Sequence, residues 1–168
     1  NSVALTDVDR CERDQDFATQ CNVTLAANMA FAAKASRSQF IQISTDHLFD
    51  GTKPLRSETD ETSPVNHYAM TKLQAETVAA EAIAESLIVR TNFFGWGPSY
   101  RSSFSDRIVG ALGNGNPINL FTDAYFTPIY IRNLIEVEHA LYTSGQSGVF
   151  NIVGDERLSK YQFGKRLS

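Results

Sequence analysis

Two short apolar runs that lead into hydroxyl-bearing residues restrict the fold of this chain more than any other feature. The first run covers residues 39–44 and continues into Thr45-Asp46, and the second covers residues 87–91. Each follows a longer segment of helical character, at about residues 14–36 and 67–85. Because helices and buried strands alternate in this way, we predict an α/β fold in which crossover helices connect the strands of a parallel sheet.

Other segments are predicted from local patterns. Residues 6–9 are expected to form a loop, Asp14 or Asp16 to cap the first long helix, and residues 118–121 to form a short strand. The first long helix carries an apolar stripe that repeats at every fourth position and is expected to face the sheet: Phe17, Cys21, Leu25, Met29 and Ala33. Asn22, beside this stripe, either faces solvent or holds a backbone kink or a water near the site.

The carboxyl ends of the strands are the expected place for a ligand, because parallel sheets of this type bind ligands there. Three segments of the sequence have the character of such ends, at Leu5, at Ser44-Thr45 and at Thr91-Asn92. We expect them to face one crevice. Arg90, one residue before the third end, is expected to neutralise a nearby carboxylate or helix end, with contact to a cofactor as the alternative.

The start of the second long helix supplies groups that suit the reduction of a carbonyl. Tyr68 and Lys72 are four residues apart, so their side chains share one helix face. A nearby ammonium lowers the pKa of a phenol, and we expect Lys72 to do this for Tyr68. The phenol then donates a proton to a carbonyl oxygen that the Thr45 hydroxyl holds in place. A cofactor must supply the hydride, because no side chain carries one.

The spacing of Tyr68 and Lys72 is a weak signal on its own. Tyr161 and Lys165 repeat it, although no hydroxyl-bearing strand end precedes them at a comparable distance. We therefore interpret Tyr161 as a packing residue of the last helix. The strand end at Ser44-Thr45 favours a catalytic interpretation of Tyr68 and Lys72 over a surface pair.

The composition excludes several other classes of protein. The chain has 168 residues, a net charge of -4 and 42% hydrophobic residues, which suits one domain with a real core and disfavours nucleic acid as a partner. No apolar run approaches the length of a membrane span, so no membrane partner is expected. Its two cysteines, Cys11 and Cys21, have no Cys/His cluster near them, which predicts neither a metal site nor a disulfide. A cytoplasmic location is expected, with a homodimer as a candidate assembly.

Two longer motifs resemble the extended short-chain dehydrogenase/reductases. They are Ser44-Thr45-Asp46-His47-Leu48-Phe49-Asp50-Gly51 and Pro64-Val65-Asn66-His67-Tyr68-Ala69-Met70-Thr71-Lys72-Leu73-Gln74-Ala75-Glu76. Within that family the dTDP-4-dehydrorhamnose reductases are the most similar, and the resemblance covers nearly the whole chain. It implies a Rossmann-like parallel sheet with flanking helices, truncated at the N-terminus, and a small C-terminal substrate-binding part.

The resemblance also implies an activity and a set of site residues. The activity is the reduction of a 4-keto nucleotide sugar by NADPH or NADH, so that NADP or NAD is the cofactor, and the catalytic triad is Thr45, Tyr68 and Lys72. The residues expected to line the cofactor are Val3, Ala4, Leu5, Ser44, Tyr68, Lys72, Thr91, Asn92 and Phe93. The residues expected near the substrate are Asp46, His47 and Asn66.

The sequence departs from the family in several places. No Gly-rich phosphate loop occurs in the chain, so we expect a piece of a longer domain that binds a dinucleotide poorly by itself. His47 stands at a Tyr position, Ala69 at a Gly position and Phe93 at a Trp position, which bears on the substrate more than on the reaction type.

The alternation of helix and strand becomes irregular beyond Gly95. We therefore predict that residues 1–95 are the C-terminal portion of a dinucleotide-binding domain and that residues 96–168 are an incomplete substrate-binding part. Two alternatives stay open: a nucleotide-sugar epimerase or dehydratase, and a non-catalytic regulatory subunit on the same fold, similar to the beta subunit of methionine adenosyltransferase.

Overall fold

A three-stranded parallel sheet carries the predicted site residues. The structure is a computed structural model that describes residues 1–168. It orders the strands β1-β2-β6, with β1 at Ile41–Thr45, β2 at Leu87–Thr91 and β6 at Gly148–Asn151. Both strand pairs are parallel, and Thr45 lies directly beside Thr91 in the register. The predicted α/β fold with a parallel sheet is therefore confirmed.

The chain divides into two compact units. The first consists of Asn1–Thr91 and Glu138–Asn151, and the second of Asn92–Val137 and Ile152–Ser168. The chain passes from one unit to the other after Thr91, after Val137 and after Asn151, and the second of these boundaries lies inside the helix α6, at Ile131–Thr143. The roles predicted for residues 1–95 and 96–168 stay predictions.

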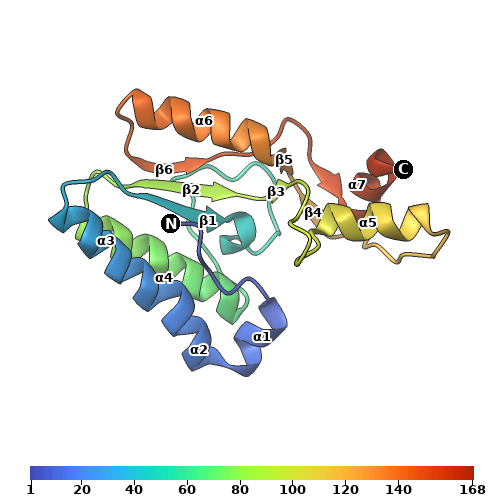
Figure 1. Cartoon of the computed structure of the whole chain (residues 1–168), viewed down its shortest axis with the longest axis horizontal. Coiled ribbons are helices and arrows are strands. Elements are labelled where there is room, and N and C mark those ends of the chain that lie inside the picture. The colour runs from blue at the N-terminus through green and yellow to red at the C-terminus, as the bar shows by residue number, and fades with distance from the viewer. The chain divides into compact units, whose positions relative to one another are not determined.

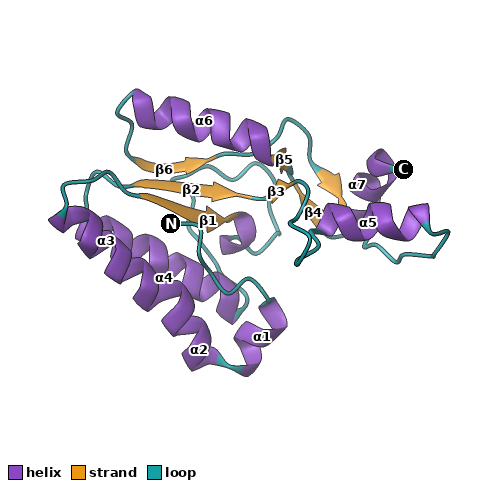
Figure 2. Cartoon of the chain, viewed as in Figure 1, coloured by secondary structure: helices purple, strands orange, loops and turns teal.

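Helices cover one face of the sheet in the first unit. The helical elements of this unit are α1 at Val8–Arg13, α2 at Gln15–Thr19, the π-helix η1 at Gln20–Thr24, α3 at Leu25–Ala35, the 3₁₀ helix η2 at Asp46–Leu48, which follows the end of β1, and α4 at His67–Ala82. Figures 1 and 2 show α3 and α4 side by side along the sheet. A core of buried side chains lies between them: Ala30, Phe40, Ala79 and Ala82.

The second unit contains short strands and two helices around an aromatic core. The strand β3 at Phe93–Phe94 pairs with β5 at Ile129–Tyr130, and β4 at Tyr125–Phe126 pairs with β7 at Leu158–Ser159. The helices are α5 at Phe104–Gly113 and α7 at Lys160–Leu167. Ile108, Phe126 and Phe163 form its buried core.

Side-chain caps explain where several helices begin. The Asp14 carboxylate accepts a hydrogen bond from the Phe17 amide at 3.2 Å, which confirms it as the start of α2. Asn66 does the same for α4, accepting from the Ala69 amide at 2.8 Å. Such caps satisfy amides that have no partner inside the helix. The second of these caps fixes the start of the helix that carries Tyr68.

Two predictions for short segments, one loop and one strand, are wrong. Residues 6–9 do not all form a loop, because Asp7 caps α1 and accepts a hydrogen bond from the Arg10 amide at 2.9 Å. Residues 118–121 do not form a strand. Ile118 and Leu120 instead pack against the core of the second unit, so their apolar character reflects burial without strand pairing.

The predicted apolar stripe of the first helix is also wrong by one position. The fully buried side chains on this face are Ala18, Asn22, Ala26 and Ala30, whereas Met29 is 37% exposed. Small side chains let α3 approach α4 closely, and α4 offers Ala75, Ala79 and Ala82 in return. Close packing here favours small residues over the longest apolar ones.

The predicted strand end at Val3-Ala4-Leu5 is not part of a strand either. Asn1 is the residue that pairs with β1, through a hydrogen bond from the Ile43 amide to its carbonyl at 3.1 Å.

None of the helices is both long enough and apolar enough to cross a bilayer.

Candidate active site

Thr45 and Tyr68 meet where β1 ends and α4 begins. Thr45 is buried, and its Oγ1 accepts a hydrogen bond from the His47 amide at 3.2 Å, which starts η2. The Tyr68 side chain, one residue inside α4, lies close enough to the Thr45 hydroxyl to interact with it. The predicted convergence of these two hydroxyl groups is therefore present in the structure.

The pKa of Tyr68 differs from the sequence-based prediction. We predicted that Lys72 lowers it, but it lies above its usual value of 10.0. Burial is the largest cause, because a phenolate loses hydration inside the protein. The hydrogen bond with Thr45 opposes the increase, and the negative charge of Asp46 adds to it. Tyr68 therefore keeps its proton at neutral pH.

Lys72 lies in the interior, one helical turn after Tyr68. The residue is 5% exposed, and its Nζ donates a hydrogen bond to the Ile43 carbonyl of β1 at 2.6 Å. Burial lowers the pKa of Lys72 to about 8, because the charged form loses hydration, while the Glu76 carboxylate opposes this decrease. Lys72 is thus cationic at neutral pH and close to losing its charge.

The residues predicted to lie near a substrate surround Tyr68. The His47 ring stands edge-on to the Tyr68 ring, with centroids 5.8 Å apart and an interplanar angle of 88°. Asp46 Oδ1 is 4.0 Å from His47 Nε2. Asn66 uses its side-chain oxygen to cap α4, so its local role is to hold Tyr68 in place.

The residues predicted to line a cofactor fall into three groups. Ser44 Oγ and Thr91 Oγ1 are buried near the ends of β1 and β2, and neither has a hydrogen-bond partner. Val3 is 57% exposed, while Ala4 and Leu5 are half-buried. Asn92 and Phe93 belong to the second unit.

Asn22 connects three parts of the first unit. It lies in the π-helix η1 and is buried, which decides against the solvent-facing alternative. Its side chain accepts from the Leu5 amide at 2.7 Å and donates to the Leu5 carbonyl at 3.1 Å and to Thr71 Oγ1 at 2.9 Å. Thr71 Oγ1 in turn donates to the Tyr68 carbonyl at 2.8 Å. Asn22 therefore supports the helical turn that carries Tyr68.

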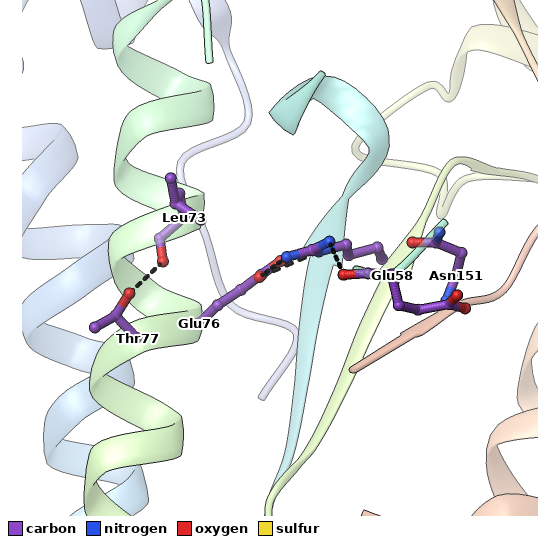
Figure 3. Close-up of polar contacts among 6 residues, drawn as sticks. Glu58, Leu73, Glu76, Thr77 and Asn151 are labelled. Carbon is purple, nitrogen blue, oxygen red and sulfur yellow. Dashed lines mark hydrogen bonds and ion pairs between the residues drawn. The ribbon is translucent and has the colours of Figure 1, made fainter. Parts of the chain in front are cut away.

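Arg90 forms a buried ion pair, as expected, but its partner was not predicted. Arg90 Nε and Nη2 donate to the Glu76 carboxylate, with the shortest distance 2.7 Å. The available signal was the position of Glu76, four residues after Lys72 on the same helix face. Figure 3 shows the Glu76 side chain extending from α4 toward Glu58 and Asn151.

Comparison with known proteins assigns this chain to a family. The profile of the RmlD substrate binding domain matches residues 1–168. The chain belongs to this family. The membership confirms the resemblance found in the motifs around Thr45 and Tyr68.

Several members of the family have been named or solved. The Haloferax volcanii protein "Probable low-salt glycan biosynthesis reductase Agl14" is 31% identical, over 99% of this chain and 57% of its own length. The dTDP-4-dehydrorhamnose reductase of Mycobacterium tuberculosis is 32% identical, over 88% of this chain and 50% of its own length. The crystal structure of Bacillus anthracis dTDP-4-dehydrorhamnose reductase in complex with NADP has a TM-score of 0.92 at 26% identity, over 99% of this chain and 59% of that one. This chain spans between 50% and 59% of the length of these three proteins.

Proposed function

We propose that the full-length protein reduces the keto group of a nucleotide-linked sugar with NADPH or NADH. The observation that carries the proposal is the interaction of the Thr45 hydroxyl with the Tyr68 phenol, with the buried ammonium of Lys72 one turn further along α4. The names of the relatives support a reductase of a dTDP-4-dehydrorhamnose-like sugar.

Tyr68 acts as the proton donor in this proposal. Its raised pKa keeps the phenol protonated at neutral pH, so a proton is available when negative charge develops on the carbonyl oxygen of the sugar. The Thr45 hydroxyl holds the same oxygen, because it already lies within hydrogen-bonding reach of the phenol. The positive charge of Lys72 stabilises the phenolate that remains after proton transfer.

The cofactor residues of the proposal fit a dinucleotide in their chemistry. A reduced nicotinamide dinucleotide, when bound, supplies the hydride. Ser44 Oγ and Thr91 Oγ1 are buried polar atoms that still lack a partner, and buried polar atoms are normally hydrogen-bonded. The two hydroxyls are therefore suited to donate hydrogen bonds to a polar ligand or to accept them from it, and the Lys72 ammonium is suited to donate. The solved NADP complex of a family member supports this choice of cofactor.

Asp46, His47 and Asn66 are the proposed substrate side of the site. All three lie within two residues of Thr45 or Tyr68 in the sequence, and His47 contacts the Tyr68 ring.

The buried Lys72 also favours an enzyme over a regulatory subunit. Burying an ammonium lowers stability, so a chain without a catalytic need for it gains nothing from keeping it.

The test is a comparison of Tyr68→Phe with the wild-type full-length protein. Oxidation of NADPH and NADH is followed with 4-keto nucleotide sugars as substrates. We expect a loss of more than about a hundredfold in kcat, because removal of a general acid has an effect of this size. Tyr161→Phe is the matched control, since Tyr161 has the same spacing to a lysine but lies on α7, and its rate should be unchanged. A normal rate for Tyr68→Phe would refute the proposed role.

A further inference from the structure

The ion pair between Arg90 and Glu76 continues into a larger cluster. The two side chains are 7% and 5% exposed, and Arg90 reaches further through Nη1 to the Glu58 carbonyl at 3.4 Å. The Glu58 carboxylate accepts a hydrogen bond from the Asn151 amide at 2.8 Å, and Asn151 Nδ2 donates to the Arg56 carbonyl at 3.2 Å. Figure 3 shows Glu76, Glu58 and Asn151 in line across the strands.

The cluster joins elements that are far apart in the sequence. Glu76 belongs to α4, Arg90 is the penultimate residue of β2 and Asn151 is the last residue of β6. Glu58 belongs to the connection between η2 and α4, residues 49–66, which we call the 49–66 loop. The cluster therefore ties this loop to one helix and to the carboxyl ends of two strands.

The 49–66 loop begins and ends at the candidate active site. It follows η2, which contains Asp46 and His47, and it precedes Tyr68 by way of the Asn66 cap. A loop of this length loses considerable entropy when it is ordered, and loops are the usual place for binding residues held by a rigid scaffold. The Arg90 guanidinium also lies 5.8 Å from the centre of the Phe49 ring, so Arg90 contacts the loop near its start and near its middle.

Glu76 also lies on the same face of α4 as the proposed catalytic residues. Tyr68, Lys72 and Glu76 follow one another at intervals of four residues, so they share one face of α4. Fixing Glu76 against β2 therefore fixes the rotation of this face relative to the strand ends. Stability alone is a weak explanation for the buried pair of Arg90 and Glu76, because apolar residues of similar volume often replace a buried ion pair without loss of stability.

We propose that Glu76, Arg90 and Glu58 act as positioning residues that hold α4 and the 49–66 loop in a fixed relation to the end of β1. The inference rests on the proposed function for its catalytic consequence and on the contacts above for its structural one. None of the three residues needs to touch the substrate. The cluster sets the distance between Thr45, on the strand, and Tyr68, on the helix.

The first experiment measures the loop without any need for activity. The double variant Arg90→Met/Glu76→Leu removes both charges of the pair together, so neither partner is left buried and unpaired, while Lys72 loses the nearby Glu76 charge but keeps its hydrogen bond to the Ile43 carbonyl. We expect its melting temperature to stay near the wild-type value, while trypsin cleaves the bond after Arg56 about tenfold faster, because opening of the loop is more frequent. Asn151→Ala, which loses the bond to the Arg56 carbonyl, should show a smaller increase. The wild-type cleavage rate in a folded double variant would overturn the proposal.

The second experiment measures catalysis in the full-length protein. The double variant should lose about tenfold or more in kcat, because small displacements of reacting groups have effects of this order. Asn151→Ala should mainly raise KM for the sugar, since it loosens the loop but leaves the pair between α4 and β2 intact. Arg90→Lys should recover part of kcat through its charge, but not the wild-type cleavage rate, because lysine lacks the fork that reaches both Glu76 and Glu58.

A matched control separates the cluster from ion pairs in general. Arg132 and Glu136 form an exposed ion pair on α6, with distances and spacing typical of a surface helix. Arg132→Gln/Glu136→Gln should leave melting temperature, cleavage and kcat unchanged. If the wild-type protein reduces no keto sugar, the proposed function fails, and the cleavage assay still decides whether the cluster holds the loop. A folded double variant with wild-type kcat would remove the catalytic part of the proposal.

Discussion

At the scale of single residues, the buried Lys72 makes the stability of the fold depend on pH. Its Nζ is buried against the Ile43 carbonyl, and its pKa is lowered to about 8. In the unfolded chain a lysine titrates near its ordinary value of 10.5. Between these two values the folded protein binds fewer protons than the unfolded chain, so the contribution of Lys72 to stability increases as pH rises from about 8 to 10.5.

Lys72→Met should therefore stabilise the fold at neutral pH while it abolishes the proposed activity. The advantage of the variant in unfolding free energy should shrink by about 2 kcal/mol between about pH 7 and pH 9.5, because the wild-type lysine loses its charge in that range. Urea unfolding of both proteins at the two pH values measures this. The exposed Lys165, replaced in the same way, is the control. An advantage that does not change with pH would contradict the lowered pKa.

The residue scale also shows what the sequence was able to predict. The interval between Tyr68 and Lys72 and the hydroxyls after β1 were enough to predict that Thr45 and Tyr68 lie close together, whereas Lys72 lies one helical turn further on, against the Ile43 carbonyl. The direction of the Tyr68 pKa was not predictable in this way. It depends on how much water the fold removes from the phenol, and a spacing of four residues carries no information about burial.

At the scale of elements, the π-helix η1 is the irregular part of the first unit. Helical segments of this kind are short and often lie at functional sites. Here the wider turn accompanies the buried side chain of Asn22, which satisfies both backbone groups of Leu5. The buried positions Ala18, Asn22, Ala26 and Ala30 also repeat at every fourth residue, so the predicted stripe had the correct spacing and erred by choosing the longer apolar side chains over the small ones.

Asn22→Ala should lower the free energy of unfolding by about 3 kcal/mol, because the Leu5 amide and carbonyl and the Thr71 hydroxyl lose a buried partner. Chemical denaturation of the variant measures the change. Asn114→Ala is the control, since Asn114 donates to the Gly110 carbonyl on the exposed end of α5. Equal effects for the two variants would show that the Asn22 contacts contribute nothing specific.

Two glycines in the helices of the second unit should respond in opposite ways to the same substitution. Gly110, inside α5, has open space where a Cβ would lie, so Gly110→Ala should stabilise by about 1 kcal/mol through helix propensity. At Gly164 in α7, a Cβ would lie 2.3 Å from Leu120 Cδ1, so Gly164→Ala should destabilise by about 1–3 kcal/mol through overpacking. Thermal unfolding of both variants tests this contrast. Stabilisation by both would show that Leu120 moves aside easily.

At the scale of the whole molecule, each of the two units has its own buried cluster. The cluster of the second unit is aromatic: the Phe163 ring lies 5.1 Å from Phe94, 5.9 Å from Phe104 and 5.3 Å from Phe126, measured between centroids. The strands around it have only two residues each, which is too short for an alternating pattern in the sequence. This explains why the sequence predicted the sheet of the first unit well and misplaced a strand at residues 118–121 of the second.

Phe163→Ala should cost about 3–5 kcal/mol, because it opens a cavity in the middle of these rings. Since the cluster contains no residue of the first unit, hydrogen exchange should speed up most in α5 and α7, and less in β1 and β2. Phe31→Ala, at a position that is 59% exposed on α3, is the control. A uniform loss of protection in both units would mean that the chain unfolds as one cooperative body.

The anchor of Lys72 has a consequence for how this protein can change. The ammonium is held by the main-chain oxygen of Ile43, an atom that every amino acid supplies. Substitutions at position 43 can thus alter bulk and shape beside the lysine without deleting its acceptor. A mutational library of this strand should accordingly tolerate Val or Leu at position 43, whereas position 72 itself should accept almost no replacement under selection for turnover.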